Sequence, residues 1–483
     1  MMKQYFFFIL FITTFNVFSQ KCDCTANFKW VQKTIEENDA GFAFAINNKG
    51  KEAYNNHTVI YKKKVATIKT LDACTQAISE WLTFLRSGHL GIRSIQTPTN
   101  SSKKKQSNAE IKASFKDWEK RTIDLEAFKK YLSTKKNHDF EGIWVSSPYT
   151  IGIKKEGDNY VGFIIEADGV YWNKGQVKLK IDAQGAAKFY LRDHSKVDFK
   201  KATLFDSNFI EMGYINLERS YPILKKNKKM SNYIKAISAN APYFERINNT
   251  TVLLRIPSFR GSEKKKIDAV IKDNKATILS TENLIIDIRN NGGGSDSSFD
   301  ELLPILYTNP IRTVGVQYLS TPLNNQRMLD FINNEDYGFD EKGKKWAKES
   351  YDTLSKHIGE FVMLKKDPVS VTSLDTIHEY PKNIGIVINK GNGSTAEQFL
   401  LAAKQSKKVK LFGATTVGVL DISNMYFVNS PCNNLKLGYS LTKSLRIPEM
   451  TIDNKGIQPD YYISKDIPKQ DWIEFVTEIL NYK

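Results

Sequence analysis

One serine of this 483-residue chain stands where a buried strand is expected to end and a helix to begin. The apolar run 384–388 has the length and β-branched content of a buried strand, and apolar residues recur at helical spacing over 399–403. Ser394 lies between the two, in a glycine-containing turn. It is therefore expected at the positive end of the helix dipole, beside free backbone N–H groups. That position suits an oxyanion, and so a nucleophilic serine.

The same residues also have a purely structural interpretation. Ser394 and Glu397 together spell the S-x-x-E capping box, which satisfies backbone N–H groups at the start of a helix. A capping box alone would say nothing about catalysis.

A second stretch, 284–296, again predicts a buried strand that opens into glycines, followed by a helix over about 299–306. Such a loop could cradle a phosphate. It contains neither G-x-x-x-x-G-K-[ST] nor G-x-G-x-x-G, however, so nucleotide binding is not indicated.

Taken together, the two stretches resemble the tail-specific, or C-terminal processing, serine peptidase family. That family combines a hydrophobic strand, D-x-R-x-N-x-G-G, and later a glycine-containing turn with S-x-x-E opening a helix. The resemblance continues in 412–418 and 453–460, and so covers roughly residues 250–465. The residues that match the two motifs are Asp287, Arg289, Asn291, Gly293, Gly294, Ser394 and Glu397.

One position departs from the processing-protease branch of this family. There a lysine follows the glycine of T-x-G-K and serves as general base, whereas Val419 follows Gly418 here and cannot take a proton. Another branch, which includes the tricorn core and the repeats of interphotoreceptor retinoid-binding protein, supplies a histidine from L-x-D-G-H. The segment 85–89 is similar, with Ser87 in place of the acid and His89 as the histidine.

The resemblance implies a serine acyl-transfer mechanism in which Ser394 attacks, His89 is the base and Asp453 orients the imidazole. Backbone N–H groups of Thr395 and of Gly293 or Gly294 are expected to hold the oxyanion. Glu397, Asp287, Arg289 and Asn291 are expected in supporting roles, Glu397 mainly as a helix cap. No metal or organic cofactor is implied.

Each of these roles has an alternative. His89, next to Gly88, could cap a helix C-terminus, and Asp453 could shape a turn with Asn454. His194 is a rival base, but it lies in a β-rich region that resembles nothing in the family. At the level of function, the alternative is a catalytically inactive ligand-binding or scaffold protein on the same fold.

The chain begins with a basic residue and a short apolar run over 5–18, as in a secretory signal peptide, so the mature chain is expected to start near Gln20 in the periplasm or outside the cell. Export permits disulfides, and Cys74 is expected to pair with Cys22 or Cys24. The fourth cysteine is Cys432.

Composition bounds the partners. The formal net charge of +17 comes partly from lysine clusters, which lack the interleaved aromatics of nucleic-acid grooves. No nucleic acid and no stable membrane insertion are therefore expected, and the resemblance to the peptidase family implies peptide or protein substrates. The sequence does not indicate an oligomeric state.

Periodicity divides the chain into four parts: a signal peptide (1–19), a helical N-terminal domain (20–135), a small β domain (139–216) and an α/β peptidase domain (217–483). The predicted fold class is an α/β catalytic domain with a mixed sheet flanked by helices, preceded by an N-terminal helical segment and a small antiparallel β domain. An insertion over 312–380, helical around 346–364, could form a lid or a substrate wall. No carboxylate-binding loop of a PDZ domain is recognisable.

Overall fold

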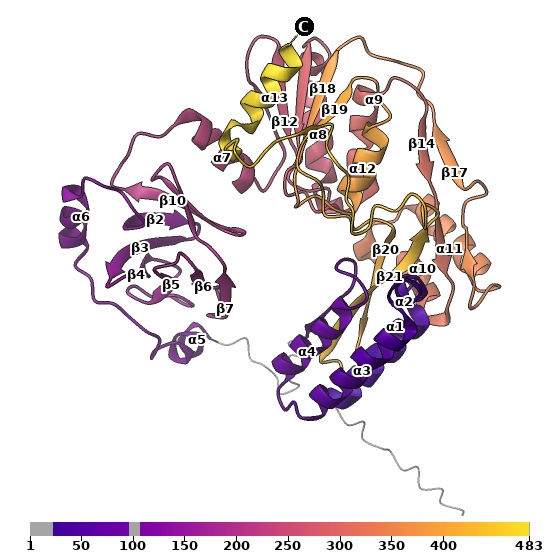
Figure 1. Ribbon diagram of the computed structural model, residues 1–483, viewed down its shortest axis with the longest axis horizontal. Coiled ribbons are helices and arrows are strands. Elements are labelled where there is room, and N and C mark those ends of the chain that lie inside the picture. The colour runs from indigo at the N-terminus through magenta and orange to yellow at the C-terminus, as the bar shows by residue number, and fades with distance from the viewer. Residues whose placement is uncertain (1–22, 96–106, 483) are drawn as a thin grey trace, which may run out of the picture. The chain divides into compact units, whose positions relative to one another are not determined.

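The computed structural model describes residues 23–95 and 107–482 (Figure 1). The expected signal peptide and Cys22 lie outside the described residues. The chain divides into two compact units, each assembled from three segments. Unit 1 comprises Met1–Thr97, Val314–Ser370 and Val419–Asn454, and unit 2 comprises Pro98–Thr313, Val371–Gly418 and Lys455–Lys483.

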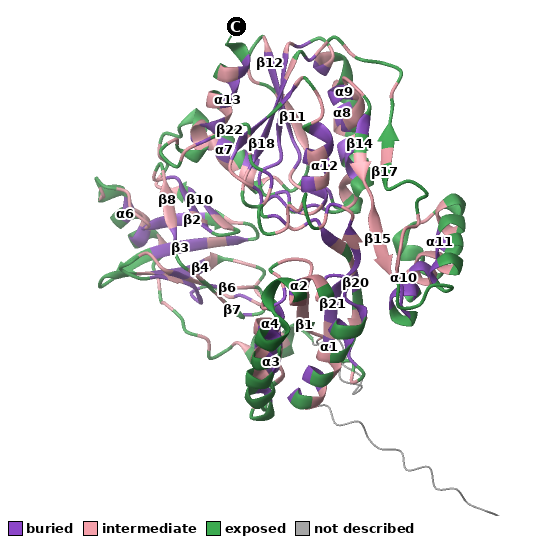
Figure 2. Cartoon of the chain, turned by 45° about the vertical axis from the view of Figure 1, so that its right-hand side comes forward, coloured by how far each residue is buried: buried purple, intermediate pink, exposed green. Residues whose placement is uncertain are grey.

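Unit 1 begins with the predicted helical segment. Asp23 accepts a hydrogen bond from Ala26 N–H and so caps the first helix, and Thr70 caps the fourth in the same way. The helices are α1 (Cys24–Asn38), α2 (Phe42–Lys49), α3 (Lys51–Ala66) and α4 (Leu71–Thr83). The lysine-rich outer face of α3 is exposed, as Figure 2 shows.

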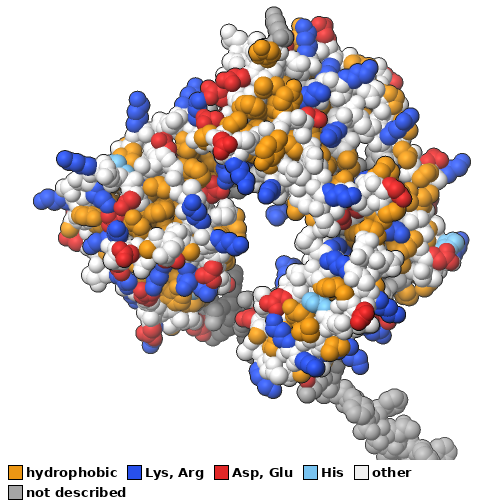
Figure 3. All heavy atoms as spheres, in the orientation of Figure 1, with side chains coloured by type: hydrophobic (Ala, Val, Ile, Leu, Met, Phe, Trp, Pro, Cys, Tyr) orange, Lys and Arg blue, Asp and Glu red, His pale blue; other side chains and the backbone are white. Residues whose placement is uncertain are grey.

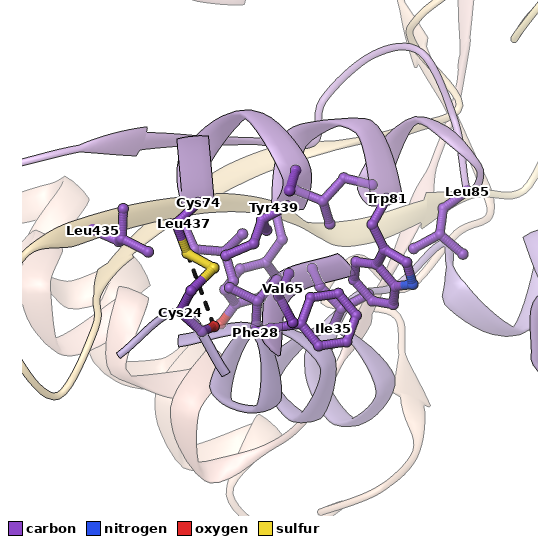
Figure 4. Close-up of a cluster of buried hydrophobic side chains, with 14 of the residues drawn as sticks. Cys24, Phe28, Ile35, Val65, Cys74, Trp81, Leu85, Leu435, Leu437 and Tyr439 are labelled. Atoms are coloured by element: carbon purple, nitrogen blue, oxygen red, sulfur yellow. Dashed lines mark hydrogen bonds between the residues drawn. A yellow bond between two sulfur atoms is a disulfide. The ribbon is translucent and has the colours of Figure 1, made fainter. Parts of the chain in front are cut away.

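Helices α1, α3 and α4 share a buried core with one long strand of the same unit (Figure 4). Phe28 meets Trp81 edge to face, with ring centroids 5.1 Å apart, and Leu437 and Tyr439 of the strand pack beside them. A disulfide joins Cys24 to Cys74. This is one of the two pairings expected from the sequence.

The sheet of unit 1 is antiparallel, in the order β1-β21-β15-β16, with β20 also paired to β21. Its strands are β1 (Gly91–Ser94), β15 (Val316–Leu319), β16 (Phe361–Val362), β20 (Ile422–Asn429) and β21 (Leu435–Ser444). Because β1 follows α4 almost directly, the turn 85–90 that carries His89 is fixed at both ends.

The predicted insertion contains a helical pair in unit 1, formed by α10 (Pro322–Asn333), η3 (Glu335–Tyr337) and α11 (Glu341–Leu354). Helix α11 ends at Leu354, whereas the sequence predicted helix as far as about residue 364. Beyond it, Gly359 N–H donates to Ser320 O (2.8 Å) and Ser320 N–H donates to Glu360 O (2.9 Å). These bonds draw the chain into strand pairing, which replaces the continued helix.

Unit 2 opens with α5 (Asn108–Ser114) and α6 (Leu125–Thr134), both within the stretch 20–135 that the sequence predicts to be helical. The small β domain then forms one nine-stranded antiparallel sheet in the order β7-β6-β5-β4-β3-β2-β10-β9-β8. The strands are β2 (Gly142–Ser146), β3 (Tyr149–Glu156), β4 (Asn159–Glu166), β5 (Val177–Ile181), β6 (Ala187–Tyr190), β7 (Lys196–Phe199), β8 (Thr203–Phe205), β9 (Phe209–Met212) and β10 (Ile215–Tyr221).

The remaining part of unit 2 is the predicted α/β sheet, in the order β11-β12-β13-β18-β19-β22, with β11 antiparallel and the others parallel. Its strands are β11 (Tyr243–Arg246), β12 (Thr251–Arg255), β13 (Asn283–Asp287), β18 (Asn383–Ile388), β19 (Val409–Gly413) and β22 (Tyr461–Tyr462). Strands β14 (Ile311–Val314) and β17 (Val369–Thr372) form a separate pair. The fold class predicted from the sequence is thus confirmed.

Helices cover this sheet, and its central strands are buried on both faces (Figure 2). The helices of this part of unit 2 are α7 (Lys228–Ser238), η1 (Gly261–Glu263), α8 (Lys264–Ile278), η2 (Asp296–Leu302), α9 (Leu303–Leu306), α12 (Thr395–Ala403), η4 (Lys469–Asp471) and α13 (Trp472–Asn481). In parallel strands the carboxyl ends share one edge, so the loops after β13 and β18 meet there.

Lysine and arginine side chains are spread over the face seen in Figure 3, with acidic side chains between them. Within residues 23–95 and 107–482, no helix combines the length and the apolar composition needed to cross a membrane.

Candidate active site

Ser394 sits at the turn from β18 into α12 in a strained backbone conformation. Its φ is +56° and its ψ is −126°, a combination that residues other than glycine rarely adopt. Strain of this kind costs on the order of 1–3 kcal/mol and persists only where the surroundings impose it. A sharp strand-to-helix turn that presents a serine is the geometry of a nucleophile elbow. A simple N-cap serine has extended backbone instead, so capping alone does not explain Ser394.

The glycine loop after β13 packs directly against the serine turn. A Cβ atom at Gly293 would lie 2.7 Å from Gly393 O and from Thr395 N, and 2.8 Å from Ser394 Cβ. A Cβ atom at Gly294 would lie 2.2 Å from Phe259 O. Both glycines also have positive φ, +97° and +153°. The two sequence motifs therefore meet in one close backbone contact, which glycine alone permits.

That loop also decides which N–H groups can serve an oxyanion. Gly293 N–H donates to Asn291 Oδ1 at 3.0 Å, so it is already engaged. Among the described residues, no acceptor is found for the N–H groups of Gly294 and Thr395. Of the two glycines that the sequence offered, Gly294 is the better donor.

Glu397 is fully buried and does more than cap α12. One carboxylate oxygen accepts Ser394 N–H at 3.2 Å, as the capping box predicts. The other accepts Thr416 Oγ1–H at 2.5 Å and Gly418 N–H at 2.7 Å. Glu397 thus ties the serine turn to the segment 416–418.

Asp287, Arg289 and Arg255 form a buried charge cluster at the end of β13. Arg289 donates hydrogen bonds to the Asp287 carboxylate from its Nε (3.0 Å) and an Nη (2.8 Å), and an Nη of Arg255 lies 3.5 Å from the same carboxylate. Burial alone would raise the pKa of Asp287, but the two guanidiniums outweigh it and hold that pKa below its usual range. The cluster is therefore a buried, charged ion-pair network that supports the start of the glycine loop.

Two asparagine side chains hold the glycine loop and the serine turn together. The Asn291 side chain accepts from Phe259 N–H and donates to Ile256 O, both at 3.2 Å. Asn392 donates to Ile288 O (2.5 Å) and to Asn291 O (3.1 Å), which joins the serine turn to the glycine loop. The sequence motifs did not single out Asn392, although its place two residues before Ser394 was a usable signal.

His89 lies in unit 1, half-buried, on the turn between α4 and β1. Its Nδ1 is 2.8 Å from Ile422 O. Because a carbonyl oxygen can only accept, Nδ1 carries the proton, and Nε2 holds the lone pair of the neutral ring. Burial lowers the pKa of His89 below its usual value, against the bond to Ile422 and the charge of Asp453, which raise it. The imidazole is therefore mainly neutral at pH 7.

Asp453 reaches the histidine through the backbone of a single residue. Its carboxylate accepts N–H bonds from Leu420 (2.6 Å), Asp421 (2.7 Å) and Ile422 (3.2 Å), and the carbonyl of Ile422 is the partner of His89. Burial raises the pKa of Asp453, and the neighbouring Asp421 adds to that effect. Asp453 therefore holds the turn 420–422 through three backbone N–H groups, and Ile422 links that turn to His89.

Val419, at the position of the processing-protease lysine, contacts the histidine turn. A Cβ atom at Gly88 would lie 2.2 Å from Val419 Cγ1, so the valine side chain covers the Gly88 backbone. Val419 thus packs against the turn that carries His89.

The rival base, His194, belongs to the core of the β domain. Its ring is stacked between Phe115 and Trp172, with both centroid distances 3.8 Å. Its Nε2 lies 2.7 Å from Tyr171 O. The structure therefore gives His194 a packing function in that domain.

A strained serine turn packs against a glycine loop at the carboxyl edge of a largely parallel sheet, which is the geometry of a nucleophile elbow. Residues 250–463 match the model of peptidase family S41. Among solved structures, mature CPAF complexed with lactacystin is 13% identical, with 95% of this chain and 97% of that chain covered and a TM-score of 0.52. A mutant of CPAF is also 13% identical, with 95% and 96% covered and a TM-score of 0.53.

At these identities the solved structures establish the fold alone, and a search among curated proteins finds no match. The match of residues 250–463 to this family model confirms the resemblance seen in the sequence. Serine peptidase is the activity that this family implies.

Proposed function

We propose that this chain is an exported serine endopeptidase of protein substrates, in the branch of its family that uses histidine as general base. The observation that carries the proposal is the backbone of Ser394. Its φ of +56° and ψ of −126° are imposed by the glycine loop and by Glu397, and they present the side chain at a helix N-terminus. Strain maintained at one serine is typical of a nucleophile.

In the proposed reaction, Ser394 Oγ forms a bond to the scissile carbonyl carbon while His89 Nε2 takes the Oγ proton. The carbonyl π electrons move onto its oxygen, which the N–H groups of Thr395 and Gly294 stabilise. The C–N bond then breaks, and the imidazolium returns the proton to the leaving amine. Water, deprotonated by the same imidazole, hydrolyses the acyl-enzyme and releases Ser394.

The neutral state of the histidine supports this role. Since Nδ1–H donates to Ile422 O, Nε2 is the nitrogen left to act as base. Asp453 steadies that carbonyl and stabilises the imidazolium by its charge. Val419 removes the lysine alternative, because it has no titratable group.

Export is supported by the Cys24–Cys74 disulfide, which fits an oxidising compartment, and by the signal-peptide pattern of the sequence. A periplasmic or extracellular enzyme would meet unfolded or secreted polypeptides. Protein substrates are therefore proposed, without a preference for particular side chains.

The test compares the purified mature chain with Ser394→Ala and His89→Ala on an unfolded protein and a peptide library, with products identified by mass spectrometry. Cleavage is expected only from the wild type, with the wild-type serine alone labelled by a fluorophosphonate probe. Cleavage that survives Ser394→Ala would refute the proposal. If the wild type neither cleaves nor is labelled, a binding or scaffold function replaces the proposed one.

A further inference from the structure

A buried ion pair lies directly beneath the histidine turn in unit 1. Arg86 binds Asp39 with both ends of its guanidinium, through two N–H···O bonds of 2.6 Å. Only 9% of the Arg86 side chain and none of the Asp39 side chain is exposed. A bidentate pair of this kind is geometrically rigid, because two parallel bonds fix the plane of the guanidinium.

The remaining donors of Arg86 are aimed at the backbone on either side of the His89 Cα atom. Nε donates to Gly88 O at 3.0 Å, and an Nη donates to His89 O at 2.9 Å. These two carbonyls belong to the peptide groups before and after His89. Fixing both peptide groups fixes φ and ψ of His89, and with them the direction of its Cα–Cβ bond.

That direction needs to be held, because His89 has φ of +51°. Left-handed backbone at a residue other than glycine is uncommon and costs free energy. Ser440 Oγ–H adds a third bond, to His89 O at 3.0 Å. Asp39 in turn accepts N–H bonds from Gly41 (3.0 Å) and Ser440 (3.1 Å), which anchor the pair to β21.

We propose that Arg86 and Asp39 are positioning residues for the general base, setting the backbone of His89 while Ile422 O sets its ring. The inference rests on the proposed function, since it assigns the pair to the catalytic histidine. A pair that only stabilised the fold would have no need to bind the two carbonyls that flank His89. Arg86 stands at the variable second position of the segment 85–89, and Asp39 lies outside every motif by which the sequence resembles the family.

The test uses Arg86→Lys, which keeps the charge, and Asp39→Asn, which keeps the shape. A lysine ammonium cannot bind Asp39 and both carbonyls in the geometry of the planar fork. We expect kcat on a peptide substrate to fall by about 100-fold, the cost of a small misplacement of a catalytic group, while KM stays within about threefold.

Thr58→Val is the matched stability control. It removes the buried Trp81 Nε1–H bond to Thr58 Oγ1 (3.1 Å) in the same helical unit, away from His89. Thermal unfolding is measured for all variants. A kcat loss in Arg86→Lys that Thr58→Val shares at equal loss of stability would assign the pair to folding and overturn the inference.

Two further readouts separate positioning from folding. The charge of Arg86 lowers the pKa of His89, so Arg86→Met should move the acid limb of kcat/KM to higher pH, whereas Arg86→Lys should leave it in place. Added methylguanidinium should partly restore kcat in Arg86→Ala. The proposed position of the guanidinium would be contradicted if the acid limb of kcat/KM did not move in Arg86→Met. It would also be contradicted if methylguanidinium did not restore kcat in Arg86→Ala.

Failure of this inference is distinguishable from failure of the proposed function. If Ser394→Ala still cleaves, the proposed function is wrong whatever Arg86 does. If Ser394→Ala and His89→Ala are inactive while Arg86→Lys and Asp39→Asn keep more than half of the wild-type kcat, the function stands and the positioning role is refuted.

Discussion

Replacing Lys178 by methionine should make the β domain more stable at neutral pH. Lys178 lies on β5 with none of its surface exposed, and its ammonium stands 3.9 Å from the ring centroids of both Tyr149 and Trp172. Its one described hydrogen bond goes to Leu191 O (3.2 Å), which also accepts Trp172 Nε1–H. Methionine would fill the same space and leave that carbonyl bonded.

The magnitude follows from the pKa of Lys178, which burial lowers from 10.5 to about 7. At pH 7 the unfolded chain binds a proton there that about half of the folded chains have given up. A difference of about 3.5 pH units corresponds to about 5 kcal/mol as an upper limit, since each unit is worth about 1.4 kcal/mol. The aromatic rings recover part of this cost whenever the amine is charged.

The sign can be tested by varying pH. Because the folded pKa lies below the unfolded one, the wild type gains stability as pH rises from 7 towards 10.5, by about 1.4 kcal/mol per unit at most. Lys178→Met lacks that gain. The advantage of the variant should therefore be largest near pH 7 and should shrink steadily by pH 9.5.

The assay is hydrogen–deuterium exchange of peptides covering β5, with wild type and variant compared at each pH, because a chain of several domains need not unfold in two states. Lys180→Met is the control, since Lys180 on the same strand is partly exposed and pairs with Glu119 at the surface. A difference between Lys178→Met and wild type that does not change with pH would refute the reasoning.

Three further outcomes are expected. Gly293→Ala should lower kcat at least 100-fold, because the added Cβ atom would lie 2.8 Å from Ser394 Cβ. The unfolding temperature of unit 1 should change little. A variant that keeps the wild-type kcat would show that catalysis does not require this loop contact. Reducing the Cys24–Cys74 bridge, which spans 50 residues, should destabilise the helical unit by about 4 kcal/mol in urea unfolding, and an unchanged midpoint would exclude this. The acid limb of kcat/KM should fall below pH 6.5, because burial lowers the pKa of His89; a limb above pH 7 would argue against it as the base.

The sequence by itself indicated the local elements. Apolar runs with β-branched residues marked the buried strands β13 and β18, and helical periodicity marked the N-terminal helical segment and α12. Local patterns fail where distant contacts compete with them, as at the end of α11, where strand pairing of Gly359 and Glu360 stops the helix. The sequence pattern could not predict this end of the helix, because the pairing partner Ser320 lies about 40 residues earlier in the chain.

For the candidate site, residue types and order were enough to select Ser394, Gly293, Gly294 and Glu397, since each motif is local and the parallel sheet brings their loops to one edge. Sequence was also enough to name His89 and Asp453 as hypotheses. It could not assign them their contacts, which run through the backbone of Ile422, a residue without a chemical signature.

Only tertiary structure decided how these groups are held. The strain at Ser394, the engagement of Gly293 N–H by Asn291 and the Arg86–Asp39 pair all depend on how the folded chain places its backbone. A sequence specifies which side chains are present and how they alternate. Backbone hydrogen bonds carry no residue identity, so the parts of the site made from carbonyl and N–H groups emerge only when the chain is folded.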